Sequence, residues 1–191
     1  MDASKPRSID SAFRLLASEQ PPIDVAVNSA GVGGIRSSTL SYPLDNWDHV
    51  MAVNLTGVFL SMQHELISMV PREKGVVLNI ASVAGTRGCP GHVAYAASKH
   101  GVVGMSRSAA LEVAGKGVRV NAVCPAFTET PMVLGLVDGD PGKLDRLGKR
   151  MPAGRLAQPE EVAAALLYLS SDAAAFVNGH TFVFDGALTA M

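Results

Sequence analysis

Apolar, strand-like segments alternate with helix-like segments along this chain, and that order limits the folds that it can form. The strand-like segments are residues 23–28, 75–82, 118–125 and 180–187, and the helix-like segments are 9–18, 44–70, 94–114 and 159–171. Such alternation predicts a mostly parallel sheet with helices on both faces. The strands are continuous apolar runs, which is typical of strands covered on both sides. We therefore expect a three-layer α/β fold.

Prolines and capping residues mark the boundaries of these segments. Asp45 is placed to cap the start of the helix 44–70, and Pro71 lies just past its end. Residues 126–158 contain several prolines and glycines, so we expect a loop there with short helical pieces. A chain of 191 residues has the length of one domain, and it can bury a hydrophobic core without disulfides or metal ions to stabilise it.

Composition excludes several functional classes. The net charge is −1, from 16 Lys+Arg and 17 Asp+Glu, and no basic block stands out, which argues against a nucleic-acid or membrane partner. No apolar run approaches the roughly 18 residues that a membrane span needs, and the first ten residues do not resemble a signal peptide. Cys89 and Cys124 are far apart, which fits two unpaired, apolar-like thiols in a reducing compartment. We expect a cytoplasmic protein.

The segment DVAVNSAGVGG, residues 24–34, is a strand that runs into a glycine-rich turn. The dinucleotide-binding fingerprint G-x-G-x-x-G has this context, with a helix directly after it. Gly31 and Gly33 supply the first two glycines, but Arg36 stands at the third position and no helix start follows. We interpret the stretch as a glycine turn after a strand. The five histidines are scattered, so no metal site is expected.

The pattern Y-A-A-S-K places Tyr95 and Lys99 four residues apart, on one face of a helix. A nearby ammonium favours the phenolate, so Lys99 is expected to lower the pKa of Tyr95 and make it a general acid/base. Ser82 stands at the carboxyl end of a strand, where open α/β sheets bind ligands, and could hold a substrate oxygen. Two alternatives stay open: a chance pair on a helix surface, and a capping serine.

Together these motifs resemble the short-chain dehydrogenase/reductase family over essentially the whole chain, in the family's order. The resemblance implies a Rossmann-like fold and a catalytic set of four residues. Tyr95 matches the proton donor, and Lys99 matches the residue that lowers its pKa and holds the nicotinamide ribose. Ser82 matches the serine that orients the substrate. Asn54, in VNLTGVF, matches the helix asparagine that holds a water against the lysine.

The resemblance also implies a cofactor, NAD or NADP. Besides Tyr95 and Lys99, the positions that match cofactor contacts are Asn28, Ala30, Gly31, Pro125, Thr128 and Thr130. Two departures stand in these motifs. Ser29 replaces the second asparagine of Asn-Asn-Ala-Gly, and Ala126 replaces the glycine after the proline. Ala126 would be strained if that position needs a positive φ.

The implied reaction interconverts a small-molecule secondary alcohol and a ketone by hydride transfer. The resemblance further implies a homo-oligomer, a dimer or tetramer paired through helices 44–70 and 94–114. The substrate pocket is expected to involve Val83, Cys89, His92 and residues 131–155. His92 is expected to be a solvent-exposed loop histidine.

The family's opening strand, glycine-rich loop and next two strands have no counterpart in this sequence. We therefore expect residues 1–191 to form one truncated Rossmann-type domain whose strand 23–28 is an open edge. Asp2 could match the aspartate that meets the adenine. By itself such a chain is expected to bind NAD(P) poorly. The alternative is a non-catalytic truncated product or a partner subunit of an oligomer.

Overall fold

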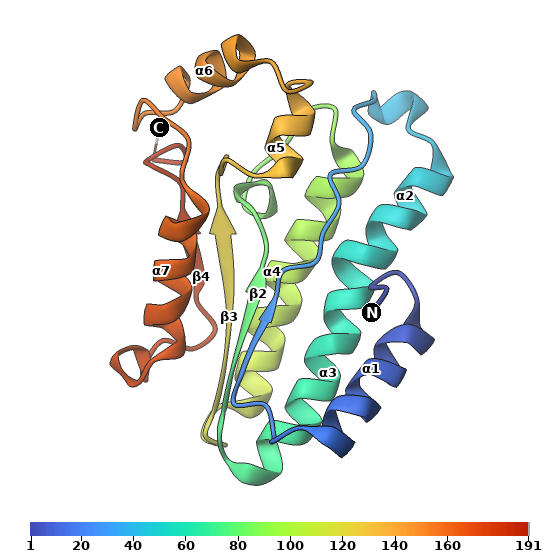
Figure 1. The fold of residues 1–191 in the computed structure, drawn as a ribbon, viewed down its shortest axis with the longest axis vertical. Coiled ribbons are helices and arrows are strands. Elements are labelled where there is room, and N and C mark those ends of the chain that lie inside the picture. The colour runs from blue at the N-terminus through green and yellow to red at the C-terminus, as the bar shows by residue number, and fades with distance from the viewer. Residues whose placement is uncertain (191) are drawn as a thin grey trace.

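The computed structural model describes residues 1–190 and contains a four-stranded parallel sheet with strand order β1-β2-β3-β4 (Figure 1). The strands are Val25–Asn28 (β1), Gly75–Ile80 (β2), Val118–Pro125 (β3) and Thr181–Phe184 (β4). Val25 of β1 is in register with Val76 of β2, which in turn is in register with Arg119 of β3. Because all pairs are parallel, the carboxyl ends of the strands meet at one end of the molecule. The predicted α/β class is confirmed.

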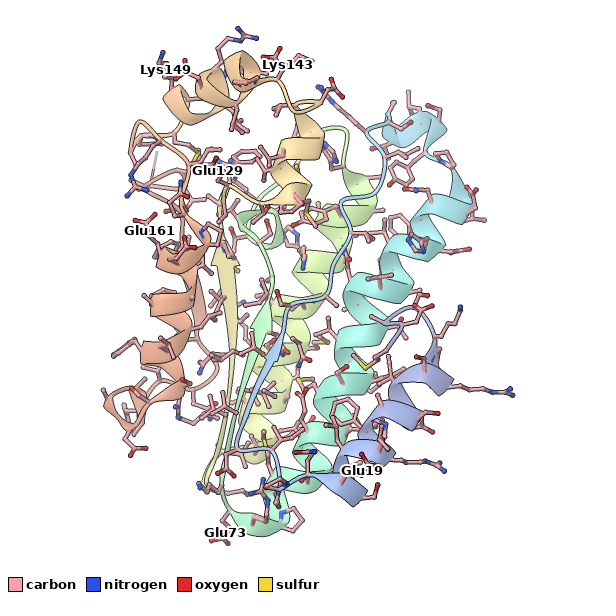
Figure 2. All side chains as sticks on the ribbon, in the orientation of Figure 1. Glu19, Glu73, Glu129, Lys143, Lys149 and Glu161 are labelled. Atoms are coloured by element: carbon pink, nitrogen blue, oxygen red, sulfur yellow. The ribbon has the colours of Figure 1, made fainter. Side chains whose placement is uncertain are left out.

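Helices connect the strands, and most lie where the sequence predicts them. They are Pro6–Glu19 (α1), Leu44–Met51 (α2), Val58–Met69 (α3), Val93–Val113 (α4), Pro131–Leu136 (α5), Pro141–Lys149 (α6) and Pro159–Ser170 (α7). The predicted helix 44–70 contains a π-helical turn, Ala52–Gly57, between α2 and α3. The predicted helical pieces in residues 126–158 are α5 and α6. Figure 2 shows Lys143 and Lys149 on α6 at one end of the molecule and Glu73 at the other.

Two helix starts differ from the predictions. α1 begins at Pro6 because proline is tolerated in the first helical turn, where its missing N–H has no partner to lose. Asp45 does not cap α2: Pro43 is the N-cap residue, and the Asp45 carboxylate accepts a bond from the N–H of Asn46. Its charge still lies in the first turn, where it favours the helix dipole.

Both faces of the central strands are covered. Val77 of β2 is buried in a cluster with α3 and α4 that includes Met62 and Ala109. The residues on either side of it, Val76 and Leu78, are buried on the opposite face in a cluster with Leu169 of α7. Figure 1 accordingly shows the sheet between α7 and the pair α3 and α4. The continuous apolar pattern of β2 thus predicts its burial correctly.

The strand β1 is different. Ala26 faces α3 and is buried, but Val25 and Val27 are 46% and 45% exposed. Among residues 1–190, β1 pairs with β2 alone, so the predicted open edge is present in the described part. The expectation of two covered faces is wrong for β1, because α7 lies over the middle of the sheet. None of the helices described in residues 1–190 is both long and apolar enough to span a bilayer.

Candidate active site at the carboxyl end of the sheet

Ser82 directly follows β2, and its side chain makes two contacts. Its hydroxyl oxygen accepts a bond from the N–H of Ala84 at 3.1 Å, which caps a short helical turn, Val83–Gly85. The hydroxyl also lies near the phenol of Tyr95 and favours the ionised form of that phenol. The capping interpretation and the catalytic interpretation of Ser82 are therefore compatible, since one side chain serves both.

Lys99 lies one turn after Tyr95 on α4 and points the same way, as the spacing predicts. Its Nζ donates to the carbonyl oxygen of Ile80 at 2.7 Å and lies 5.7 Å from the centroid of the Tyr95 ring. The side chain is only 4% exposed, and burial lowers the pKa of Lys99 to about 8. The ammonium is thus held at the end of β2, beside the phenol.

The prediction that the pKa of Tyr95 is lowered is wrong. Burial raises the pKa of Tyr95 above its ordinary value, and the nearby Ser82 hydroxyl opposes this only in part. The sequence placed Lys99 close enough to act, but its hydrogen bond goes to Ile80 and its charge stays 5.7 Å from the ring. At neutral pH the phenol is therefore protonated and can donate.

Asn54 lies in the π-helical turn and is fully buried. Its Oδ1 accepts from the N–H of Val32, and its Nδ2 donates to the carbonyl of Val32, both at 2.8 Å. A further bond joins Nδ2 to the hydroxyl of Ser98 at 3.2 Å. Through Asn54, these contacts link the segment after β1 to α4, the helix that carries both Tyr95 and Lys99. The water-holding role of Asn54 stays a prediction.

The turn after β1 is brought close to this set. A Cβ placed on Gly31 would lie 3.5 Å from Oδ1 of Asn54 and 3.5 Å from Nζ of Lys99. Ser29 and Ala30 in this turn are exposed. A nicotinamide ribose needs hydrogen-bond partners for its hydroxyl groups, and the Lys99 ammonium beside this turn has the chemistry of such a partner, so the residues present fit that half of a dinucleotide. After Gly31 the chain continues as a non-helical segment and not as a helix N-terminus.

The remaining predicted cofactor contacts lie after β3, which ends at Pro125. The hydroxyls of Thr128 and Thr130 donate to the carbonyls of Ala126 and Thr128, within their own segment. Within residues 1–190 neither threonine hydroxyl bonds Tyr95. Ala126 does not have a positive φ, so the strain considered for it is not present.

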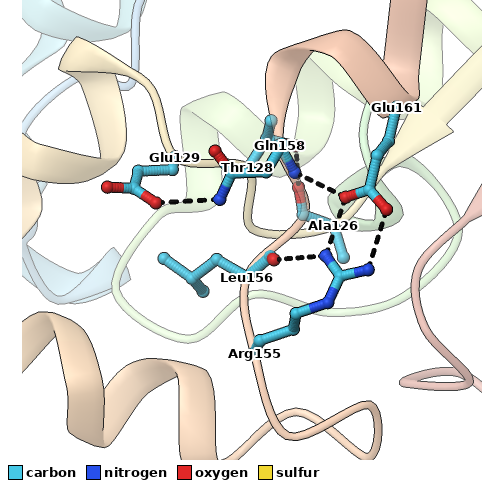
Figure 3. Close-up of polar contacts among 7 residues, drawn as sticks. All are labelled: Ala126, Thr128, Glu129, Arg155, Leu156, Gln158 and Glu161. Carbon is cyan, nitrogen blue, oxygen red and sulfur yellow. Dashed lines mark hydrogen bonds and ion pairs between the residues drawn. The ribbon is translucent and has the colours of Figure 1, made fainter. Parts of the chain in front are cut away.

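The segment that carries Thr128 lies beside residues 155–161, which lead into α7 (Figure 3). The Arg155 guanidinium donates two bonds to the Glu161 carboxylate, at 2.7 and 2.8 Å. Gln158 bonds Glu129 through its side chain, and the backbone N–H of Glu129 donates to Ala157. Two segments distant in sequence are thereby joined beside the carboxyl end of β3.

The predicted pocket residues are partly brought together. Val83 is buried in one cluster with residues of the segment 131–155, namely Val133 and Met151. Cys89 and His92 precede α4 and are half-buried. His92 does lie in the loop directly before α4, as expected, but it is half-buried and not solvent-exposed, because it stands at the N-cap of α4 against the preceding turn.

Sequence reasoning missed Glu65, which is 4% exposed on α3 and bonds Asn28 at 3.0 Å. Burial raises its pKa to about 7. Its spacing from Met62 and Met69, three and four residues away, places it on the apolar face of its helix. An acidic residue on the apolar face of a predicted helix is the sequence signal from which Glu65 could have been identified.

Comparison with known proteins now adds to this geometry. The family model described as enoyl-(acyl carrier protein) reductase matches residues 1–189. The chain belongs to the short-chain dehydrogenase/reductase family. It is 38% identical over 188 residues to cyclohexanol dehydrogenase of Acinetobacter sp. (strain SE19), covering 98% of this chain and 72% of that protein. It is 42% identical over 188 residues to D-threitol dehydrogenase of Mycolicibacterium smegmatis, covering 98% and 71%.

A solved structure agrees with these relatives. The crystal structure of levodione reductase superposes with a TM-score of 0.94 at 34% identity, over 99% of this chain and 75% of that one. The family consists of oxidoreductases that use NAD(P) in general. The resemblance drawn from the motifs and the Rossmann-like fold are therefore both confirmed.

Proposed function

We propose that Tyr95, Ser82, Lys99 and Asn54 form the catalytic set of an NAD(P)-dependent oxidoreductase that interconverts a secondary alcohol and a ketone. One observation carries the proposal. The hydroxyl of Ser82 and the phenol of Tyr95 lie near each other at the carboxyl end of β2, and the Lys99 ammonium is 5.7 Å from the centroid of the Tyr95 ring. Two hydroxyls that converge at this edge can both bind one substrate oxygen.

The chain's own residues supply position and proton transfer. In the direction of reduction, Ser82 and Tyr95 donate hydrogen bonds to the substrate carbonyl, and these bonds strengthen as negative charge develops on its oxygen. Tyr95 then gives its proton to that oxygen, which it can do because burial keeps the phenol protonated at neutral pH. A bound nicotinamide would supply the hydride.

Lys99 has two roles in this proposal. An ammonium has three N–H donors, and one of them is used by the carbonyl of Ile80. The others are free to bind a ribose hydroxyl and to pass a proton toward Tyr95 through water. Because its pKa is about 8, Lys99 is mostly protonated at neutral pH yet can exchange its proton readily. Asn54 would fix the water of that path.

The proposed cofactor contacts follow the turn after β1 and the segment after β3. They are Asn28, Ala30, Gly31, Tyr95, Lys99, Pro125, Thr128 and Thr130. We propose that this chain by itself binds NAD(P) weakly, because the turn at Gly31 leads into a non-helical segment and offers a pyrophosphate no helix N-terminus. Titration of the purified chain with NADH and NADPH tests this, and micromolar binding would refute it.

The oxidoreductase function is tested by a substrate panel. The purified chain is incubated with NAD⁺ or NADP⁺ and with cyclohexanol or D-threitol, the alcohols named in its relatives, while the absorbance of reduced nicotinamide is followed. Turnover that is lost in the Tyr95→Phe variant supports the proposal. Saturable cofactor binding without turnover of any secondary alcohol contradicts it.

The open edge of β1 favours a second candidate, a non-catalytic partner subunit. Val25 and Val27 are nearly half exposed beside backbone groups that no strand within residues 1–190 pairs. In either case we propose a homo-oligomer, dimer or tetramer, because α3 and α4 carry exposed apolar residues, Ile67 and Leu111, on their outer faces. Sedimentation of the chain tests this. We further propose one domain over residues 1–191 and a cytoplasmic location.

A further inference from the structure

Glu65 is a buried acidic side chain that the proposed mechanism leaves unused. It lies on the inner face of α3 between Met62 and Met69, which are 4% and 0% exposed. Its Oε2 accepts a hydrogen bond from Nδ2 of Asn28 at 3.0 Å. Asn28 is the last residue of β1 and opens the turn that ends at Gly31.

The contacts of Asn28 define how its side-chain amide is oriented. Nδ2 donates to Glu65 and also to Oδ1 of Asn79 on β2, at 2.9 Å. Asn79 in turn donates to the hydroxyl of Ser106 on α4, at 3.0 Å. Both N–H groups of the Asn28 amide therefore point inward, and its carbonyl oxygen is left to point away from these partners.

An ionised carboxylate is suited to select this orientation, because it accepts hydrogen bonds and cannot donate them. If the Asn28 amide were reversed, two oxygens would face each other across a buried contact. A glutamine at position 65 would make no such choice, since its amide can either donate or accept. Leucine would form no bond at all.

Core stability alone does not account for this residue. A carboxyl group loses its hydration on burial, and an apolar side chain of similar size would suit the face between Met62 and Met69 better. What the carboxylate adds is a preference for one orientation of its partner. That partner begins the turn whose Gly31 lies against Asn54 and Lys99.

We propose that Glu65 is a positioning residue: it fixes the Asn28 amide with its carbonyl oxygen outward, and thereby sets the turn of residues 28–31 that contacts the cofactor. The second half of this inference rests on the proposed function. The first half does not, since it concerns contacts within the chain.

The orientation is expected to depend on pH in the neutral range. Burial raises the pKa of Glu65 to about 7, and the bond from Asn28 opposes that rise. Protonated Glu65 can donate, so its selection weakens at lower pH. Its bonding partner Asn28 is neutral, and so are Asn79, which Asn28 also bonds, and Ser106, which Asn79 bonds. The adjacent titratable pair is His64 with Asp10 of α1, 2.9 Å apart.

The test is a pH titration of the ¹⁵N-labelled chain, in which the side-chain NH₂ signals are followed and Asn28 is assigned with an Asn28→Ser variant. The Asn28 signals are expected to shift with a midpoint near pH 7 and to stop shifting in Glu65→Gln, which leaves His64 in place. Asn121 is the control, because it is fully buried and, within residues 1–190, its amide bonds the backbone of Val177 and His180 and no titratable side chain. An Asn28 signal that titrates no more than that of Asn121 overturns the proposal.

A second measurement tests the link to the cofactor. In Glu65→Gln the KM for NAD(P)H, or its dissociation constant, is expected to rise ~10-fold, as for a lost hydrogen bond to a charged group, with kcat little changed. An unchanged KM and dissociation constant overturn that link. If the wild-type chain shows no turnover, the proposed function fails, yet the NMR titration still decides the role of Glu65.

Discussion

Two neighbouring strands of this sheet have similar sequences and different surroundings. Val76 of β2 and Val25 of β1 are partners in the parallel register, yet Val76 is 9% exposed and Val25 is 46% exposed. Two residues further along each strand, Leu78 is fully buried while its register partner Val27 is 45% exposed. An apolar strand pattern thus predicts a strand of the sheet, while the neighbouring elements decide whether both of its faces are covered.

The difference coincides with a difference in chemistry. At the centre of the sheet Ser82 caps the turn after β2 and the buried Lys99 bonds the end of that strand, whereas β1 contributes a turn whose residues Ser29 and Ala30 are exposed. The polar link between the two regions is Asn28, bonded to both Glu65 and Asn79. Substitutions at the centre, at this link and at the edge should therefore have separable effects.

The largest effect is expected at the centre, in Tyr95→Phe. Removing the phenolic hydroxyl removes the proton donor, so turnover should fall by about 10²–10⁴-fold while cofactor binding is retained. Tyr168→Phe is the matched control, because Tyr168 is 48% exposed on α7 and should leave turnover unchanged. Steady-state kinetics on both variants measure this. Near-normal turnover in Tyr95→Phe would remove that residue from the mechanism.

The link between centre and edge should give the stability of the chain a pH dependence. The pKa of Glu65 is raised from 4.5 to about 7, so the folded state holds this proton more tightly than the unfolded state. The stabilisation is fully present below pH 4.5 and is lost as the pH rises through about 7. Its size is on the order of 3 kcal/mol.

Glu65→Gln should abolish this component of the pH dependence. Denaturant unfolding of both proteins between pH 5 and 8 measures the difference in free energy of unfolding between them. The wild-type protein should lose stability relative to the variant as the pH rises. Parallel curves for the two proteins would show that Glu65 titrates in the same way in both states.

The register partners test the comparison directly. Val76→Ala should lower the free energy of unfolding by about 2 kcal/mol, because it removes packed methyl groups and leaves a cavity. Val25→Ala should cost about 0.5 kcal/mol, because nearly half of that side chain already contacts water. Equal losses in the two variants would mean that β1 is covered in solution, for instance by a second copy of the chain.

A similarly small effect, of opposite sign, is expected beyond β4, at the other edge of the sheet. Ala187 has a φ of 69°, a left-handed conformation that costs an alanine roughly 1–2 kcal/mol. Ala187→Gly relieves this strain and should raise the free energy of unfolding by about 0.5–1 kcal/mol, after the greater freedom of glycine when unfolded is subtracted. Ala175→Gly, at a φ of −55°, is the control and should destabilise. Stabilisation in both variants, or in neither, would argue against a backbone cause.

The sequence by itself determined the order of helices and strands, the parallel sheet and the positions of the motif residues. Local rules explain this success: hydrophobic periodicity defines the elements, and residues four apart share a helix face, as Tyr95 and Lys99 do. The π-helical turn at Asn54 could not be seen in this way, because α-helical and π-helical turns have similar sequence patterns.

Only the tertiary structure decided the properties that depend on what surrounds a residue. The pKa of Tyr95 is raised and not lowered, because its burial and the distance of Lys99 are set by packing between α4 and β2. Glu65 meets Asn28 across 37 positions of the chain, and Val25 is exposed because α7 does not reach it. Burial, charge and hydrogen bonding act through space, so a pattern along the chain predicts where a residue lies more readily than what it meets there.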